Sequence, residues 1–481
     1  MGRHRTLIGI AVAVMVGCAI LVASDRESVP VPGVWTSHLI RGVPHVHQKP
    51  DFCGEACVAS WLQKLGSAAD QDDVFNISGL DPTLGRGCYT KELADALNNI
   101  GFKTGPVWHP VAINHCEQQL GEIWSSMMTD LGAGVPSIIC MRTSDGPTAT
   151  EHFRLVLGYD AKTDEVIYHE PASASGAYQR LARATLMNLW PLKYSARQWT
   201  VIRFALRMDG NPLVPSHAGH TDADYAQHIM RLKQRLPGND FNILVEHPFI
   251  VISDESPQRS KNRAEQIVRW ATAKLKEAYF PKDPKQILEI WLFKDKPSYD
   301  ANTVRLFGSR PSTPFGYYSS TDGALVMNIA TGGGTLVHEI VHPFMESNFP
   351  ECPAWLNEGL GSLYEQSSTR NGQIVGLTNW RLAGLQTAIQ RDQVPTFGEL
   401  CSTTADQFYR ADPGTNYAQA RYLCYYLQEQ GLLRKFYHQF VADHQLDPTG
   451  YQTLKTTLGV ADMEKFKTDW ETYVMSLRFH R

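Results

Sequence analysis

The chain has 481 residues, of which 43% are hydrophobic and 20% are charged, and its formal net charge is −4. These values are ordinary for globular proteins, and the length predicts two or three domains. The small negative charge, without a basic stripe in the sequence, gives no basis for nucleic-acid binding.

An apolar run follows a basic N-terminus. Arg3 and Arg5 precede the run at 7–23, which ends in small residues suited to cleavage near Ser24. This pattern predicts that residues 1–24 are a cleaved export signal. An uncleaved membrane anchor is the alternative, since the run is at the lower limit of length for crossing a bilayer. We therefore expect a protein that is secreted, periplasmic or tethered to the outer face of a membrane.

The first group of chemically active residues begins at Gln48. Cys53 stands where a helix is predicted to begin, and the positive end of a helix dipole favours a thiolate. Gln48 is close enough in sequence to offer an amide hydrogen to an oxyanion beside the sulfur. His152 begins a predicted strand and Glu170 ends the next one, so a hairpin can bring them together as base and orienting carboxylate.

These residues resemble the papain-like C39 peptidases, whose pattern is Q-x-x-x-x-C-G-x-A-C, then H-F/Y-x-x-x-x-G-Y, then an acidic residue before proline. The resemblance covers about 38–205 and implies a peptide or protein substrate. It implies that Cys53 is the nucleophile and His152 the base. Gln48 would be the oxyanion donor and Glu170 the orienting residue, where the family usually has aspartate.

Other interpretations of this half stay open. Extracellular cysteines commonly form disulfides, and Cys57 lies on the same helix face as Cys53 and competes for pairing. The half would then be a peptide-binding module that does not cleave. Acyl transfer is a further alternative, because an amine can resolve a thioester in place of water.

A second motif, H-E-I-V-H, occupies 338–342. On a helix, His338 and His342 lie on one face and can reach the same metal ion, and Glu339 can accept a proton from water there. Glu358, on the next predicted helix, completes three ligands and leaves a fourth position open. The helix is largely apolar and should be buried, which argues against two solvated surface histidines because unpartnered burial would be costly.

With P-A-W-L-N-E-G-L at 353–360, this motif resembles the gluzincin metallopeptidases, and within them the peptidase MA-like group. The resemblance covers roughly 240–480. It implies a Zn²⁺ ion bound by His338, His342 and Glu358. It also implies that Glu339 is the general base.

The same resemblance implies an edge strand near 316–318 that would hold an extended substrate by β-augmentation. It places Tyr417 where similar enzymes have a tyrosine that stabilises the oxyanion, with a packed aromatic as the simpler alternative. Thr335 is the predicted N-cap of the metal helix. Pro343 should kink that helix or end it early.

Periodicity and turn residues predict an α+β chain. A papain-like C39 domain would span 34–207, and a zincin-like metallopeptidase domain would span 241–478, with a sheet lobe and then a helical C-terminal lobe. The range 208–240 is the predicted linker region, with a short helical run at 226–236. The sequence thus predicts an exported zinc-dependent peptidase fused to a C39-like cysteine peptidase domain. The alternative is that only the zinc site, or neither site, is active.

Overall fold

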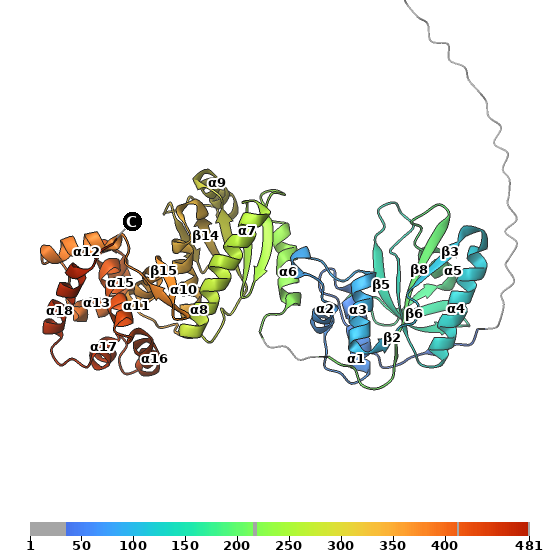
Figure 1. Cartoon of the computed structure of the whole chain (residues 1–481). Coiled ribbons are helices and arrows are strands. Elements are labelled where there is room, and N and C mark those ends of the chain that lie inside the picture. The colour runs from blue at the N-terminus through green and yellow to red at the C-terminus, as the bar shows by residue number, and fades with distance from the viewer. Residues whose placement is uncertain (1–34, 215–218, 411–412, 480–481) are drawn as a thin grey trace, which may run out of the picture.

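The computed structural model describes residues 35–214, 219–410 and 413–479. In this range the chain is a mixed α/β protein with two main sheets, each covered by helices (Figure 1). The predicted export signal at 1–24 lies outside the described residues. None of the helices within them combines the length and the apolar character that a membrane crossing requires.

The N-terminal half is built on a seven-stranded sheet in the order β3-β8-β4-β5-β6-β7, with β1 beside β5. All of its pairings are antiparallel. The strands are β1 (His38–Leu39), β3 (Trp108–Ala112), β4 (Ser137–Arg142), β5 (Glu151–Asp160), β6 (Glu165–His169), β7 (Gln179–Ala182) and β8 (Gln198–Ala205). The predicted strand that begins at His152 therefore forms as β5, and the next strand, β6, ends one residue before Glu170.

Helices cover both faces of this sheet. Ile138 and Cys140 of β4 point into a core with α1–α3, whereas Ile139 and Met141 point into a second core with α4 and α5, as strand alternation requires. The helices are α1 (Cys53–Lys64), α2 (Gln71–Ser78), α3 (Thr90–Ile100), α4 (Cys116–Gly132) and α5 (Arg183–Leu189), with the short η1 (Pro82–Leu84) and η2 (Ile113–His115). A small ribbon pairs β2 (Phe102–Lys103) with β9 (Arg207–Met208).

The helix predicted within the linker range is α6 (Asp222–Lys233), and it lies between the two halves in Figure 1. Ala223 and Ala226 are buried in the N-terminal core, whereas Ile229 and Leu232 are buried in the core of the second sheet. The side-chain amide of Gln227 donates a 2.8 Å hydrogen bond to the Pro50 carbonyl. The segment is therefore a packed element shared by both halves.

The second sheet has five strands in the order β10-β11-β12-β14-β13. They are β10 (Asn242–Glu246), β11 (Phe249–Ser253), β12 (Leu288–Phe293), β13 (Gly316–Ser319) and β14 (Ala324–Asn328). The inner pairs β11–β12 and β12–β14 are parallel, and β13 lies at the edge, antiparallel to β14. The predicted edge strand near 316–318 is thus present. Every residue of β11, β12 and β14 is buried, which explains their continuous apolar runs.

Three helical segments follow β11 where the sequence predicts one helix over 260–279. They are α7 (Pro257–Arg263), the π-helical η3 (Ala264–Arg269) and α8 (Trp270–Ala278). Helix α9 (Lys296–Phe307) covers the other face of the sheet, against Trp291 and Phe293.

Helix α10 (Gly334–Asn348) follows β14 and η4 (Ile329–Thr331) and carries the H-E-x-x-H motif. One expectation about it is wrong, and one of the two alternatives expected for Pro343, an early end of the helix, does not occur. The N-cap position is Gly333, not Thr335, because the helix begins at Gly334. Pro343 does not end the helix, which continues to Asn348 with Phe344 and Met345 buried in the main core.

The remaining described chain is helical apart from one hairpin of β15 (Ser367–Arg370) and β16 (Gln373–Gly376). Its helices are α11 (Ala354–Leu363), α12 (Arg381–Gln390), α13 (Phe397–Cys401), α14 (Ala405–Arg410), α15 (Pro413–Glu429), α16 (Leu433–Asp443), α17 (Tyr451–Leu458) and α18 (Met463–Ser476). They pack around the buried Trp355 and Trp470. The C-terminal part is therefore helical, as predicted from the sequence.

Candidate functional site

Helix α10 places the two histidines of the motif side by side. The ring centroids of His338 and His342 are 4.9 Å apart, and His338 is only 7% exposed. One ring nitrogen from each histidine and one carboxylate oxygen of Glu339 all lie within 4.8 Å of one another. This cluster could hold a metal ion.

A further carboxylate reaches the same point from α11. Glu358 Oε2 lies 3.1 Å from Nε2 of His338, and Glu358 Oε1 lies 3.9 Å from Nε2 of His342. The predicted ligands His338, His342 and Glu358 are therefore brought together, with Glu339 beside them.

The opposite ring nitrogens have partners that the sequence did not reveal. His338 Nδ1 lies 3.3 Å from a Glu365 oxygen, and His342 Nδ1 lies 3.0 Å from Oδ1 of Asn357. Such outer contacts orient both rings so that Nε2 faces the centre of the cluster. Asn357 directly precedes Glu358, which was a usable signal, whereas nothing in the spacing points to Glu365.

Glu365 is itself held firmly. Arg381 donates from Nε and Nη2 to its two carboxylate oxygens at 2.9 and 2.7 Å. The chain approaches very closely at Gly334, where a Cβ atom would lie 2.0 Å from the Glu365 carbonyl oxygen. A glycine is therefore required at the start of α10, and the contact ties that helix to the residue that orients His338.

Burial and charge act in opposite directions on the carboxylates. Burial raises the pKa of Glu358, but the charges of His342 and His338 outweigh it and bring the pKa to about 2. Burial also raises the pKa of Glu339, and there the histidine charges do not fully offset it. Glu358 is therefore ionised at neutral pH, whereas Glu339 is the carboxylate better suited to accept a proton.

Two tyrosines stand beside Glu358. The predicted residue Tyr417 lies in α15, with its ring 5.1 Å from the guanidinium carbon of Arg381. Tyr409, which the sequence did not single out, donates a 2.7 Å hydrogen bond to Glu358 Oε1. Burial raises the pKa of both hydroxyls, so both keep their protons at neutral pH.

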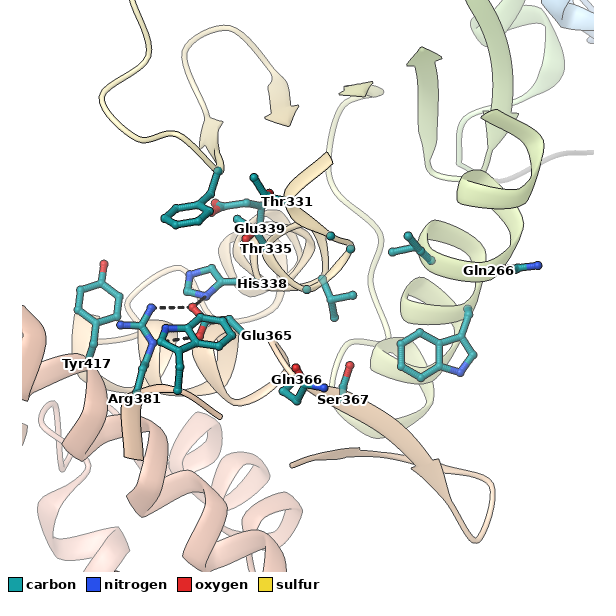
Figure 2. Close-up of a pocket in the computed structure, with 18 of the residues that line it drawn as sticks. Gln266, Thr331, Thr335, His338, Glu339, Glu365, Gln366, Ser367, Arg381 and Tyr417 are labelled. Carbon is teal, nitrogen blue, oxygen red and sulfur yellow. Dashed lines mark hydrogen bonds and ion pairs between the residues drawn. The ribbon is translucent and has the colours of Figure 1, made fainter. Parts of the chain in front are cut away.

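Two cavities meet at Glu339. The larger, of about 990 Å³, is lined by residues of η3, of α10 and of the helical lobe, including Tyr417 (Figure 2). The smaller, of about 430 Å³, is lined by Tyr318, Glu346 and Glu358, among others. His338 and Glu339 line both, so a ligand in either cavity reaches the cluster.

The N-terminal residues also gather at one place. Cys53 is the first residue of α1, and this helix packs against β5, which carries His152. The His152 imidazole donates from Nε2 to Glu170 Oε1 at 2.5 Å. Gln48 is tied to the same hairpin, since its backbone N–H donates to the Pro171 carbonyl at 2.9 Å.

A residue that the sequence did not single out completes the surroundings of Glu170. Arg154, two positions after His152 on β5, donates from Nε to Glu170 Oε2 at 2.7 Å. Burial raises the pKa of Glu170, but the His152 bond and the Arg154 charge outweigh it and lower the pKa to about 2. The Glu170 side chain, which is longer than the aspartate usual in the C39 family, is thus held by His152 at one oxygen and by Arg154 at the other.

The expectation that Cys53 favours the thiolate is wrong. Burial raises the pKa of the Cys53 thiol to about 12, although a hydrogen bond from the Phe153 backbone opposes it, and the charges of Glu55 and Asp51 raise it further. Desolvation outweighs the helix dipole here. The eight cysteines among the described residues are all free thiols, so no disulfide to Cys53 is seen there.

We expect Cys53 to react slowly with iodoacetamide at pH 7 and faster as the pH approaches 12. The physical reason is that only the thiolate is nucleophilic. The rate is measured on the full chain by peptide mass mapping, with Cys53→Ser as the control that assigns the signal. If the midpoint of the rate against pH lay at or below about 8.5, the ordinary pKa of a free cysteine, burial would not control the ionisation of Cys53.

A second expectation concerns Glu170. Its pKa lies near 2, below the ordinary 4.5, so the carboxylate stabilises the fold above about pH 4.5 and this stabilisation is lost as the pH falls toward 2. Glu170→Gln should lower the free energy of unfolding by about 1–3 kcal/mol at pH 7 and by roughly half as much at pH 3. Denaturant titrations of both proteins measure the difference. The exposed Glu117→Gln is the control, and an equal loss at both pH values would show that the charge of Glu170 is not involved.

Comparison with known protein families matches residues 40–197 to the model of a family described as Peptidase_C39 like family. The matched range contains Gln48, Cys53, His152 and Glu170. The match supports the predicted C39-like N-terminal half and a peptidase-related function. A search of curated proteins finds no match to the chain.

Proposed function

We propose that the chain is an exported zinc-dependent peptidase whose active site lies on α10 and α11, behind a C39-like N-terminal half. The observation that carries the proposal is the convergence of Nε2 of His338, Nε2 of His342 and the Glu358 carboxylate, with Glu339 beside them. The apolar run at 7–23 supports the export part of the proposal.

The donor set fits zinc in type and in surroundings. Zinc takes imidazole nitrogen and carboxylate oxygen, and catalytic sites use three protein ligands with one open position. Both Nδ1 atoms have oxygen partners, which leaves Nε2 of His338 and His342 for the ion. Glu365 is already paired with Arg381, whereas the carboxylates of Glu339 and Glu358 face the two histidines, and a divalent cation would offset their charge.

When bound, zinc would polarise the scissile carbonyl and make a nearby water more acidic. Glu339 then accepts a proton as the water oxygen bonds to the carbonyl carbon, and it delivers that proton to the leaving amine as the C–N bond breaks. The Tyr318 N–H donates to Glu339 Oε2 at 3.0 Å and holds the carboxylate in place. Tyr417 can donate to the oxyanion because its hydroxyl remains protonated, whereas Tyr409 already donates its hydroxyl hydrogen to Glu358.

The test is cleavage of a random peptide mixture by the mature protein and by two variants. We expect a metal chelator to abolish cleavage and added zinc to restore it. Cys53→Ala should leave this activity in place, whereas Glu339→Ala should remove it. Cleavage that is lost only in Cys53→Ala, and is indifferent to the chelator, would assign the activity to the N-terminal half and overturn the proposal.

A second candidate function concerns the N-terminal half. Burial raises the pKa of the Cys53 thiol to about 12, which argues against cleavage by Cys53 and leaves peptide binding as the second candidate. In that case a labelled peptide should bind to wild type and to Cys53→Ala with equal affinity. Cysteine-dependent hydrolysis, or transfer of an acyl group to an added amine, would instead show that Cys53 acts as a nucleophile.

A further inference from the structure

The larger cavity extends from Glu339 into a space walled by three separate parts of the chain. Figure 2 shows Gln266 on one side, His338 and Glu339 at the centre, and Arg381 with Tyr417 on the other side. Its volume of about 990 Å³ is larger than that of a single amino-acid side chain and lies at the upper end of the range for ligand pockets.

Four aromatic side chains, those of Trp270, Phe315, Trp380 and Tyr417, line this cavity. Phe315 and Trp380 are 51% and 52% exposed, although both are large and apolar. Trp270 is half-buried, and its indole N–H donates to Thr369 Oγ1 at 3.1 Å, which fixes the ring between α8 and β15. Exposed aromatics gathered around one hollow are typical of a surface that binds an apolar ligand.

A π-helical turn builds one of these walls. Segment η3 inserts wide turns between α7 and α8, and it carries Gln266 and Ile267 into the cavity lining, just before Trp270. Ile267 packs so closely on Gly333 that a Cβ there would lie 2.6 Å from its Cδ1 atom. Such turns inside α-helices are frequently found at functional sites.

The charges on the walls are largely neutralised. Among the described residues that line the cavity, the side chains that can carry a charge near neutral pH are His338, Glu339, Glu365 and Arg381. Glu365 and Arg381 form a bidentate pair with each other. Beyond the cluster itself, the cavity therefore offers no unpaired charge to a ligand, unlike the smaller cavity with its exposed Glu346.

Strand β13 links the two cavities along the sheet edge. Phe315, just before the strand, lines the larger cavity, whereas Tyr317 and Tyr318 line the smaller one. The Tyr318 N–H points to Glu339 and is not used in the pairing with β14. A peptide laid along this edge would pass Glu339 with one end in each cavity.

We propose that the site selects extended peptides that carry a bulky apolar residue, aromatic above all, on the side of the scissile bond held by Ile267, Trp270 and Trp380. The inference rests on the proposed function, because it names the substrate class of the same site. The apolar residue is desolvated in the larger cavity, and the peptide backbone adds to the edge of β13.

The first test is cleavage profiling with a random peptide mixture, followed by sequencing of the products. We expect Phe, Trp or Leu to be enriched at one position beside the cut. Trp380→Ala, whose side chain is half exposed, should lower kcat/KM by roughly tenfold for a peptide with Phe at that position and leave an Ala peptide unchanged. Trp270→Ala is the second variant, and Trp108→Ala, an exposed tryptophan of the N-terminal half, is the matched control.

The second test measures binding without turnover. A fluorescein-labelled peptide of the enriched sequence, added to Glu339→Gln, should bind more weakly when Trp380→Ala is introduced in addition. The inference would be overturned if cleavage showed no residue preference, or if Trp380→Ala had the same kcat/KM as wild type for both the Phe and the Ala peptide. The proposed function would still stand. Absence of any cleavage by wild type would overturn the proposed function. In that case, the affinities of labelled Phe and Ala peptides for the wild-type protein would test the inference. Tighter binding of the Phe peptide would support it, and equal affinities would overturn it.

Discussion

Replacing Glu339 with glutamine should reduce peptide hydrolysis by roughly 100- to 10,000-fold while zinc stays bound. Glutamine can keep the hydrogen bond from the Tyr318 N–H, because its amide oxygen still accepts, but it cannot take a proton from water. The proposed ligands His338, His342 and Glu358 are untouched. Turnover is measured on a peptide cut by wild type, and zinc is measured by elemental analysis of the same preparation.

The matched control for this variant is Glu351→Gln, an exposed carboxylate shortly after α10. It makes the same chemical change outside the cluster and should leave turnover as in wild type. Unchanged turnover in Glu339→Gln would remove Glu339 from the mechanism even if zinc remained bound. Loss of zinc together with activity would instead make Glu339 a ligand.

His342→Ala should lose the metal and part of the stability of the second half. A ligand that binds only the folded state stabilises it by about 4 kcal/mol when its concentration is a thousand times Kd, so loss of the site should lower Tm clearly. Wild type should contain one zinc per chain, and added zinc should raise its Tm after chelation. Neither effect should occur in His342→Ala.

Exposed His220 supplies the control, since His220→Ala removes an imidazole that precedes α6 and is not part of the cluster. It should keep both the zinc content and the response of Tm to zinc. Wild-type protein that is purified without metal and whose Tm does not respond to added zinc would show that His338, His342 and Glu358 do not form a zinc site.

Local spacing explains which parts of the site were predictable. His338, Glu339 and His342 share a helix face by periodicity alone, and Cys53 begins a helix as its surroundings in the sequence predict. Glu365 and Tyr409 escaped prediction because they reach the cluster through tertiary contacts with no fixed distance along the chain.

Tertiary packing also explains the errors. The pKa of Cys53 depends on burial, which a helix start does not reveal. Pro343 removes one helical hydrogen bond, yet Phe344 and Met345 are anchored in the core and keep the last turns in place. The π-helical η3 was invisible because a helical apolar pattern persists through it.

Helix α6 has a consequence for how the protein can be divided. Its Ala223 and Ala226 complete the core of one half, while Ile229 and Leu232 complete the core of the other. A cut before the helix uncovers an apolar patch on the N-terminal fragment, and a cut after it uncovers one on the C-terminal fragment. No cleavage point in this region yields two fragments with closed surfaces, so we expect each half to be less stable alone than in the whole chain.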